Sequence, residues 1–220
     1  GVEGTGVTVF YPEGKVSDAQ RLQMVTQRGA NVAVCGIRGT FDDAQTQVKR
    51  IFADEGLRGR LEREGVVLSS ANSINVGRLA PQVAYYFSAY AQLLARGAIR
   101  KGDELDFVVP TGNFGDVLAG YYAKRLGLPV GRLTVASNSN RVLFDFLRTG
   151  VYDRRRDFAK TISPSMDILV SSNLERMLYY LTGGDAERVA DLMEVPQDIV
   201  TAPGALSPAR IGGSLEFDRV

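Results

Sequence analysis

The chain has 220 residues, of which 45% are hydrophobic, and its 26 basic and 25 acidic residues give a net charge of +1. With no histidine and only Cys35, it excludes a Ser-His-Asp triad, histidine or cysteine metal sites and an internal disulfide. The balanced charge argues against nucleic acid as a partner, and the lack of both a long apolar run and a signal peptide predicts a cytoplasmic protein without a membrane partner.

The first 68 residues predict alternating strands and helices. Residues 6–11 are β-branched and aromatic, as in a strand, and Ser17 is a suitable N-cap for the helix that follows. The expected strands are 6–11, 31–38 and 66–68, and the expected helical segments are 19–28, 42–54 and 56–65, the last being a surface helix or a connector. A subdomain boundary is expected near the last of these strands.

The rest of the chain repeats the alternation. Residues 76–94 predict one long helix whose apolar stripe packs in the core; the stripe consists of Leu79, Val83, Tyr86, Phe87, Tyr90 and Leu94. The other expected elements are strands 106–109 and 132–136, helices 117–126, 142–148 and 173–181, and a polar loop over 149–164. This order predicts an α/β fold with parallel sheet layers and helices on both faces.

The segment from Thr111 to Asp116 joins an apolar strand to a helix and contains Gly112 and Gly115. Free backbone N–H groups and the positive end of a helix favour a phosphate in such a loop. The segment matches neither the Walker pattern nor GxGxxG, and a tight turn between strand and helix also needs glycine for steric reasons. Spacing alone therefore leaves both interpretations open.

Three further segments are rich in short polar side chains. Residues 69–75 precede the long helix and favour capping over ligand binding, and residues 161–168 with 171–173 are compatible with turn and cap chemistry alone. Ser171 or Ser172 is expected to cap the helix that follows. Residues 138–140 come just after a strand, at the edge where open parallel sheets bind ligands.

Taken together and in order, these segments resemble the threonine synthase family. Residues 109–116 with 119–124 look like the pyridoxal-phosphate loop and the following helix of that family. The other similar segments are 10–17 with Gln20, Gln23 and Met24, then 39–45, 70–75, and 163–168 with Ser172 and Asn173. The resemblance covers about residues 6 to 181 and favours the phosphate interpretation of the glycine loop.

The resemblance implies a fold type II pyridoxal-phosphate enzyme, similar in fold to the tryptophan synthase β subunit. Its implied reaction converts O-phospho-L-homoserine and water to L-threonine and phosphate, with the cofactor as electron sink. The implied cofactor-binding residues are Gly112, Asn113, Phe114, Gly115 and Asp116, and the implied substrate-binding residues are Asn72, Ser73 and Asn75.

The family's Schiff-base lysine is absent from the similar segments, because none of the five lysines has Phe-Lys-Asp surroundings. In the family that lysine precedes the segment similar to 10–17. We therefore expect a central fragment, with residues 1–67 as the remainder of a small domain and 68–220 as part of the large cofactor-binding domain. The 220-residue chain is expected to be inactive by itself and to self-associate through uncovered apolar surface.

Two alternatives remain at this stage. One is a non-catalytic relative that binds a phosphorylated ligand or a partner protein. The other is a related enzyme such as a threonine dehydratase, against which segments 12–17 and 70–75 argue. Val76 and Gly77 stand where the family has an aromatic and a small residue, and Arg141 stands where it has aspartate. These differences leave the fine shape of the cleft open, and with it a threonine synthase-like protein of altered activity.

Overall fold

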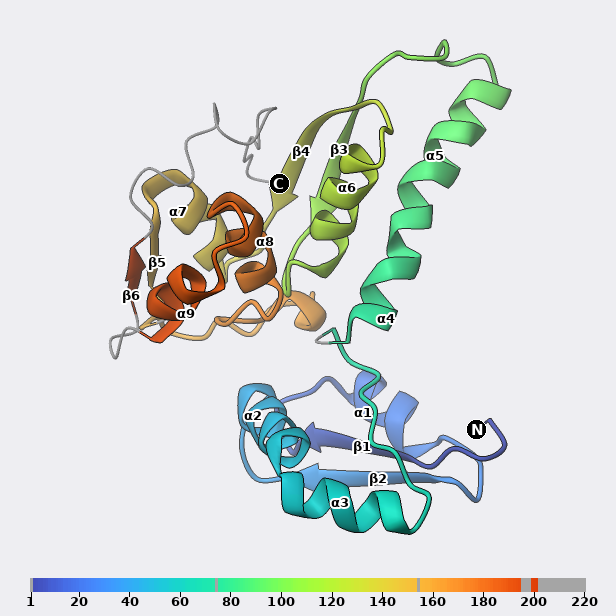
Figure 1. Cartoon of the computed structure of the whole chain (residues 1–220), viewed down its shortest axis with the longest axis vertical. Helices are drawn as coiled ribbons and strands as arrows, with labels where there is room; N and C mark the ends of the chain where they lie inside the picture. Colours follow the sequence, from blue (N-terminus) through green and yellow to red (C-terminus); the bar gives the residue numbers. More distant parts are fainter. Residues whose placement is uncertain (1, 74, 154, 195–198, 202–220) are drawn as a thin grey trace. The chain divides into compact units, whose positions relative to one another are not determined.

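The computed structural model describes residues 2–73, 75–153, 155–194 and 199–201. The chain divides into two compact units, residues 1–69 and 70–220 (Figure 1). The assignment of these units to the small and large domains of an enzyme stays a prediction. Among the described residues, no helix is long and apolar enough to cross a membrane.

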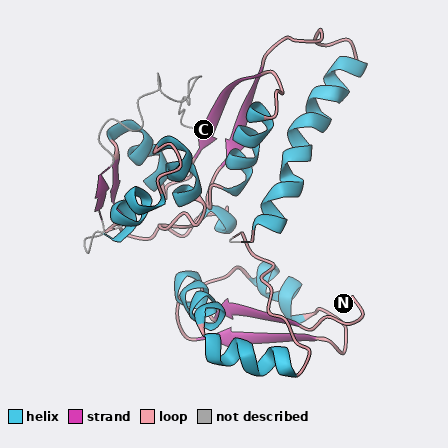
Figure 2. Cartoon of the chain, in the orientation of Figure 1, coloured by secondary structure: helices cyan, strands magenta, loops and turns pink. Residues whose placement is uncertain are grey.

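The first unit is a two-stranded parallel sheet with three helices. Strand β1 (Val7–Pro12) pairs with β2 (Val32–Ile37) along its whole length. The helices are α1 (Asp18–Val25), α2 (Phe41–Ala53) and α3 (Glu55–Arg63), so the predicted alternation is confirmed here (Figure 2).

Local sequence fixes where the first two helices begin. The Ser17 hydroxyl accepts the Gln20 N–H at 3.2 Å, and the Gln20 side chain accepts the Ser17 N–H at 3.3 Å. Thr40 and Asp43 form the same reciprocal pair at the start of α2, at 3.1 and 2.7 Å. Each pair satisfies two amides that a helix N-terminus otherwise leaves free.

The predicted strand over residues 66–68 is wrong. Gly65, at φ 74°, ends α3, and the Val66 N–H turns back to the Leu61 carbonyl at 2.9 Å. Val67 is 83% exposed, and no strand of the described residues pairs with this segment. A β-branched run forms a strand only where a neighbouring strand and a packed face accept it.

The second unit contains a β-α-β unit. Strand β3 (Leu105–Pro110) pairs in parallel with β4 (Val130–Ala136), and α6 (Gly115–Arg125) connects them. Helix α5 (Val83–Ala95) runs beside α6 (Figure 1). The fold is therefore α/β with parallel strand pairs, as expected.

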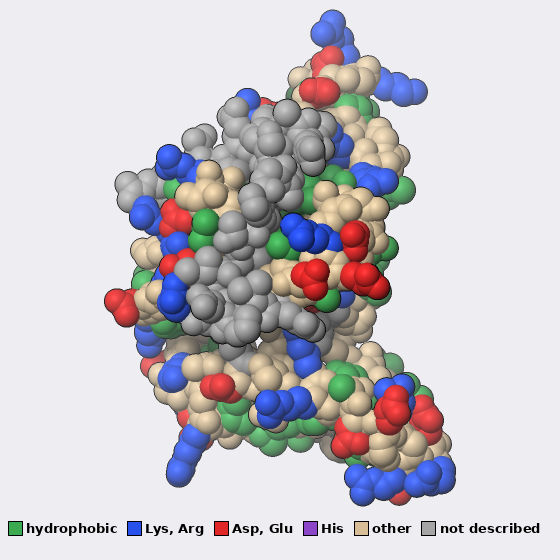
Figure 3. Space-filling model, turned by 60° about the vertical axis from the view of Figure 1, so that its left-hand side comes forward, with side chains coloured by type: hydrophobic (Ala, Val, Ile, Leu, Met, Phe, Trp, Pro, Cys, Tyr) green, Lys and Arg blue, Asp and Glu red, His purple; other side chains and the backbone are tan. Residues whose placement is uncertain are grey.

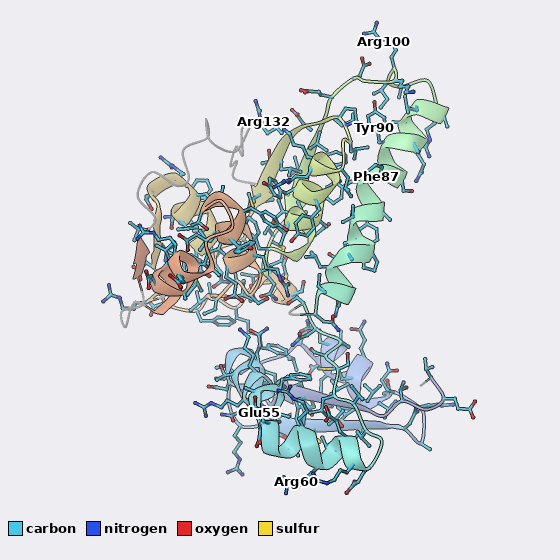
Figure 4. The ribbon with its side chains drawn as sticks, viewed as in Figure 1. Glu55, Arg60, Phe87, Tyr90, Arg100 and Arg132 are labelled. Carbon is cyan, nitrogen blue, oxygen red and sulfur yellow. The ribbon has the colours of Figure 1, made fainter. Side chains whose placement is uncertain are left out.

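The predicted helix over 76–94 is interrupted. It consists of α4 (Val76–Leu79), a 3₁₀ turn (Ala80–Gln82) and α5, because Pro81 has no N–H to continue an α-helical ladder. Most of its apolar stripe is confirmed, since Leu79, Tyr86 and Tyr90 are buried. Phe87, labelled with Tyr90 in Figure 4, is 39% exposed and does not belong to the core.

The remaining elements follow β4. They are α7 (Val142–Thr149), β5 (Val151–Asp153), a 3₁₀ turn (Pro164–Met166), α8 (Leu174–Leu181), α9 (Ala186–Glu194) and β6 (Ile199–Thr201). Strand β5 falls within the expected loop and pairs antiparallel with β6, which departs from the all-parallel expectation. A strand of three residues is too short to show an alternating pattern.

Helix α6 is the centre of this unit's core. Val117, Leu118, Ala119 and Ala123 are at most 1% exposed, and a Cβ at Gly120 would come within 2.7 Å of the Tyr86 ring. Burial on so many sides holds the start of α6 in one position relative to β3.

On the face drawn in Figure 3, basic and acidic side chains are intermixed.

Candidate functional site

The glycine loop lies at the carboxyl ends of the two parallel strands. The Thr111 N–H donates to the Ala136 carbonyl at 2.9 Å, which continues the β3–β4 pairing, and the Thr111 hydroxyl donates to the Val109 carbonyl at 2.6 Å. Ligands of open parallel sheets bind at this edge. The structure therefore places the loop where its sequence context predicts a ligand.

Backbone amides of this loop are free of protein partners in the described part of the chain. The N–H groups of residues 113–116 donate to no described residue, and α6 has no side-chain cap. Its N-cap residue is Phe114, at φ 60° and 1% exposed, so packing of the ring supports the left-handed backbone. Free amides at a helix N-terminus attract an anion.

Gly112 is required by close packing. A Cβ at this position would lie 3.2 Å from the Ser165 carbonyl oxygen and 3.3 Å from the Met166 Cα. Both contacts are with backbone, which moves less easily than a side-chain end. This glycine is therefore explained by the close approach of residues 165 and 166 and not by a tight turn, since its φ is not positive. The packing accompanies the free amides rather than replacing them.

One acidic side chain, Asp116, belongs to the first turn of α6. The Tyr86 hydroxyl donates to its backbone carbonyl at 2.8 Å and to its carboxylate at 3.1 Å. Burial raises the pKa of Asp116, although the hydrogen bond from Tyr86 acts in the opposite direction. Burial and the neighbouring carboxylate also raise the pKa of Tyr86. The acid is thus held against α5.

Two of the three predicted substrate residues, Asn72 and Asn75, form hydrogen bonds within their own turn. Asn72 accepts the Ser70 hydroxyl at 2.8 Å, and Asn75 caps α4 by accepting the Gly77 N–H at 2.8 Å. The Ser73 hydroxyl instead lies 3.0 Å from the hydroxyl of Ser172, which is 99 residues away in sequence. The capping interpretation is confirmed for Asn75, and substrate contact by all three stays a prediction.

The segment before α8 binds the glycine loop directly. The Ser171 hydroxyl donates to the Gly112 carbonyl at 2.9 Å, and Asn173 donates its N–H and its Nδ2 to the Asn113 carbonyl at 3.1 and 2.9 Å. The predicted capping by Ser171 or Ser172 is wrong, since the N-cap of α8 is Asn173 without a side-chain cap bond. The fold uses these hydroxyls for long-range contacts.

Arg176 joins the same cluster and was not predicted from the sequence. Its guanidinium donates to the Asn173 side-chain oxygen and, at 3.5 Å, to the Ser73 carbonyl. An arginine three residues into a helix gives no local signal of this role. Segments 70–75, 111–116 and 171–176, separate in sequence, therefore form one polar site.

A buried carboxylate, Asp167, organises the neighbouring loop. It is 8% exposed and accepts hydrogen bonds from the side chains of Asn138, Asn140 and Thr161 at 2.7 to 3.0 Å and from the Thr161 N–H at 2.8 Å. The loop it holds includes Ser165, which packs on Gly112. Residues 138–140 and 161–168 thus support the site together. Arg141, in contrast, lies 3.5 Å from Asp145 of α7.

No lysine amine is bonded to the loop within the described residues. Lys124 donates to the Gly131 carbonyl at 3.0 Å, near the start of β4 and thus at the opposite edge of the sheet. Lys160 is exposed. No group of three or more metal-ligating side chains occurs in the described part of the chain. The free amides of residues 113–116 are thus the groups of this site that can bind an anion.

Comparison with known proteins gives consistent relatives, although no family model matches. The chain is 49% identical to threonine synthase-like 1 of Macaca fascicularis, and the match covers 84% of this chain and 25% of that protein. It is 42% identical to threonine synthase of Pseudomonas aeruginosa, and that match covers 93% of this chain and 40% of the relative. A crystal structure of pyridoxal-phosphate-bound threonine synthase from Brucella melitensis matches all of this chain with a TM-score of 0.78 and 40% sequence identity. The crystal structure of yeast threonine synthase also matches all of it, with a TM-score of 0.79 and 36% sequence identity. The chain spans less than half of each relative.

Proposed function

Because the chain belongs to the threonine synthase family, whose members match 84 to 93% of its length, we propose that it is part of an enzyme that forms L-threonine and phosphate from O-phospho-L-homoserine and water. The family uses pyridoxal phosphate, and one of the matching structures contains it. The single observation that carries the proposal is the set of free amides at residues 113–116, at the ligand-binding edge of the sheet.

These residues fit the phosphate of the cofactor. Four free amides and the positive end of an 11-residue helix favour a doubly charged anion, and Gly112 lets the backbone of the 161–168 loop close against the site. The backbone of Gly112, Asn113, Phe114, Gly115 and Asp116 would hold this group. When bound, pyridoxal phosphate supplies an electron sink for the carbanions of a β,γ-replacement.

We assign the substrate side of the site to Asn72, Ser73 and Asn75. The support is that Ser73 lies in the same polar cluster as the glycine loop, through Ser172 and Arg176. The exposed, free Cys35 fits a reducing compartment such as the cytoplasm.

Catalysis by this chain alone is not expected, because the five lysines lack the surroundings of the family's catalytic lysine. A non-catalytic relative that binds a phosphorylated ligand is the second candidate. Its support is the 48 to 49% identity to proteins named threonine synthase-like 1, against 41 to 42% for several threonine synthases.

Titration of the purified chain with pyridoxal phosphate, followed by absorbance, tests the cofactor assignment. We expect pyridoxal phosphate to bind and pyridoxal, which lacks the phosphate, to bind much more weakly. Equal binding of the two, or no binding, would contradict the assignment. Incubation with O-phospho-L-homoserine and cofactor should yield no threonine from this chain, and threonine formation would show that one of its own lysines suffices.

A further inference from the structure

We propose that Ser171 and Asn173 are positioning residues that orient the peptide groups of the glycine loop, so that its N–H groups face the bound phosphate. The inference rests on the proposed function, in which this loop holds the phosphate of the cofactor. It adds a role for two side chains that contact only the back of the loop, through its carbonyl groups.

The first step concerns two consecutive carbonyls. Ser171 donates to the Gly112 carbonyl at 2.9 Å, and Asn173 donates twice to the Asn113 carbonyl, at 3.1 and 2.9 Å. Both donors are at most 4% exposed, so water does not replace these bonds easily. The two carbonyls are therefore fixed on the side of the 171–173 segment.

The second step follows from peptide planarity. All peptide bonds of the described residues are trans, and in a trans peptide the N–H points opposite to the carbonyl. Fixing the carbonyls of Gly112 and Asn113 consequently directs the N–H groups of Asn113 and Phe114 away from residues 171–173. These N–H groups, and those of Gly115 and Asp116, have no acceptor among the described residues. The donors thus form a preorganised anion nest.

The third step is the orientation of the Asn173 side chain. Arg176 donates to its oxygen, and a guanidinium can only donate, so the Asn173 oxygen must face Arg176. The amide nitrogen is then the atom directed at the Asn113 carbonyl. Arg176 in this way selects the rotamer of Asn173 that supports the loop, while the Tyr152 hydroxyl accepts the Ser171 N–H at 2.7 Å and holds that residue.

The experiment measures binding of inorganic phosphate to the isotope-labelled 220-residue chain by nuclear magnetic resonance. In the unsubstituted chain, phosphate should shift the amide signals of residues 113–116. Ser171→Ala and Asn173→Leu each remove a side-chain donor to the loop without adding a charge near the phosphate, and each should weaken phosphate binding about tenfold, the effect of one hydrogen bond. Ser171→Thr keeps the hydroxyl and should restore binding.

Ser88→Ala is the control, because it removes an exposed hydroxyl of α5 that accepts the Gln92 side chain of the same helix and is bonded to no residue of the loop. Its phosphate affinity should stay within about twofold of the unsubstituted chain. If Asn173→Leu fails to fold, the comparison of the alanine and threonine variants at Ser171 decides. If Ser171 contributed to stability alone, Ser171→Ala would lower the melting temperature without selectively weakening phosphate binding.

Two results would overturn the inference: unchanged phosphate affinity in Ser171→Ala, or no shift of the 113–116 amides in the unsubstituted chain. The outcome is separable from that of the proposed function. Phosphate binding that depends on Ser171, without binding of pyridoxal phosphate, would support the inference and contradict the cofactor assignment. Binding of pyridoxal phosphate with an affinity that neither substitution changes would support the cofactor assignment and contradict the inference.

Discussion

Replacing Asp167 with alanine should destabilise the second unit more than replacement of any exposed acid. Its carboxylate is buried and accepts four hydrogen bonds, from Asn138, Asn140 and two groups of Thr161. These bonds connect the end of β4 to the loop that packs on Gly112. The substitution would leave four donors without their common acceptor in a site with little access to water.

The expected loss can be bounded from these contacts. A hydrogen bond to a charged group contributes about 1.5 to 3 kcal/mol, but four bonds to one carboxylate are not additive. The remaining donors are neutral, and leaving each of them unsatisfied costs about 1 to 3 kcal/mol, so we take about 3 to 5 kcal/mol as the expected fall in the free energy of unfolding. Asp167→Asn, which keeps the shape but places an NH₂ group among donors, should show a smaller loss.

Urea unfolding followed by near-ultraviolet circular dichroism of tyrosine isolates the relevant unit. Eight of the nine tyrosines lie in residues 70–220, and Tyr11 is the exception. With a typical slope of about 2 kcal/mol per molar urea, the midpoint of Asp167→Ala should fall by about 2 M. Far-ultraviolet circular dichroism, which reports both units, should show the first unit's transition unchanged.

Asp191→Ala provides the control, since Asp191 is exposed on α9 and forms no hydrogen bond or ion pair with the described residues of the 161–168 loop. Its free energy of unfolding should stay within about 0.5 kcal/mol of the unsubstituted chain. A loss below about 1 kcal/mol in Asp167→Ala would refute the reasoning, because it would mean that the four donors find other partners at little cost.

Three further results are expected. Gly120→Ala would place a Cβ 2.7 Å from the Tyr86 ring, so the free energy of unfolding should fall by about 1 to 3 kcal/mol, as urea titration can measure. Because burial raises the folded-state pKa of Asp116, its contribution to stability is present below its ordinary pKa and is lost as the pH rises. The stability of Asp116→Asn relative to the unsubstituted chain should therefore increase as the pH rises above the ordinary aspartate pKa of about 4. Phe10 and Phe41 are 41% and 48% exposed, so the chain should self-associate, and a monomer at all concentrations in sedimentation would contradict this.

Sequence reasoning succeeded where short-range interactions decide the outcome. The first two helices begin at Ser17 and Thr40 because each residue completes a capping box with a residue three positions later. The strands of the β-α-β unit were predictable from continuous apolar runs. Order of motifs along the chain was sufficient to indicate the family.

Errors arose where a segment's partner is distant in sequence. Residues 66–68 have the composition of a strand but no neighbouring strand among the described residues. Strand β5 was missed because its three residues become a strand only by pairing with β6, nearly 50 residues later. Pairing depends on what lies beside a segment, which its own residues do not encode.

The sequence by itself determined the α/β class, the glycine loop at the end of a strand and the exclusion of a Ser-His-Asp triad and of an internal disulfide. Only the tertiary structure decided that Ser171 and Asn173 bind the carbonyls of that loop and that Arg176 and Ser73 lie in the same cluster. Serine and asparagine before a helix have the same local chemistry whether they cap that helix or reach a loop 60 residues away. Packing of α8 beside the loop selects between these two uses, because it brings the carbonyls within hydrogen-bonding distance.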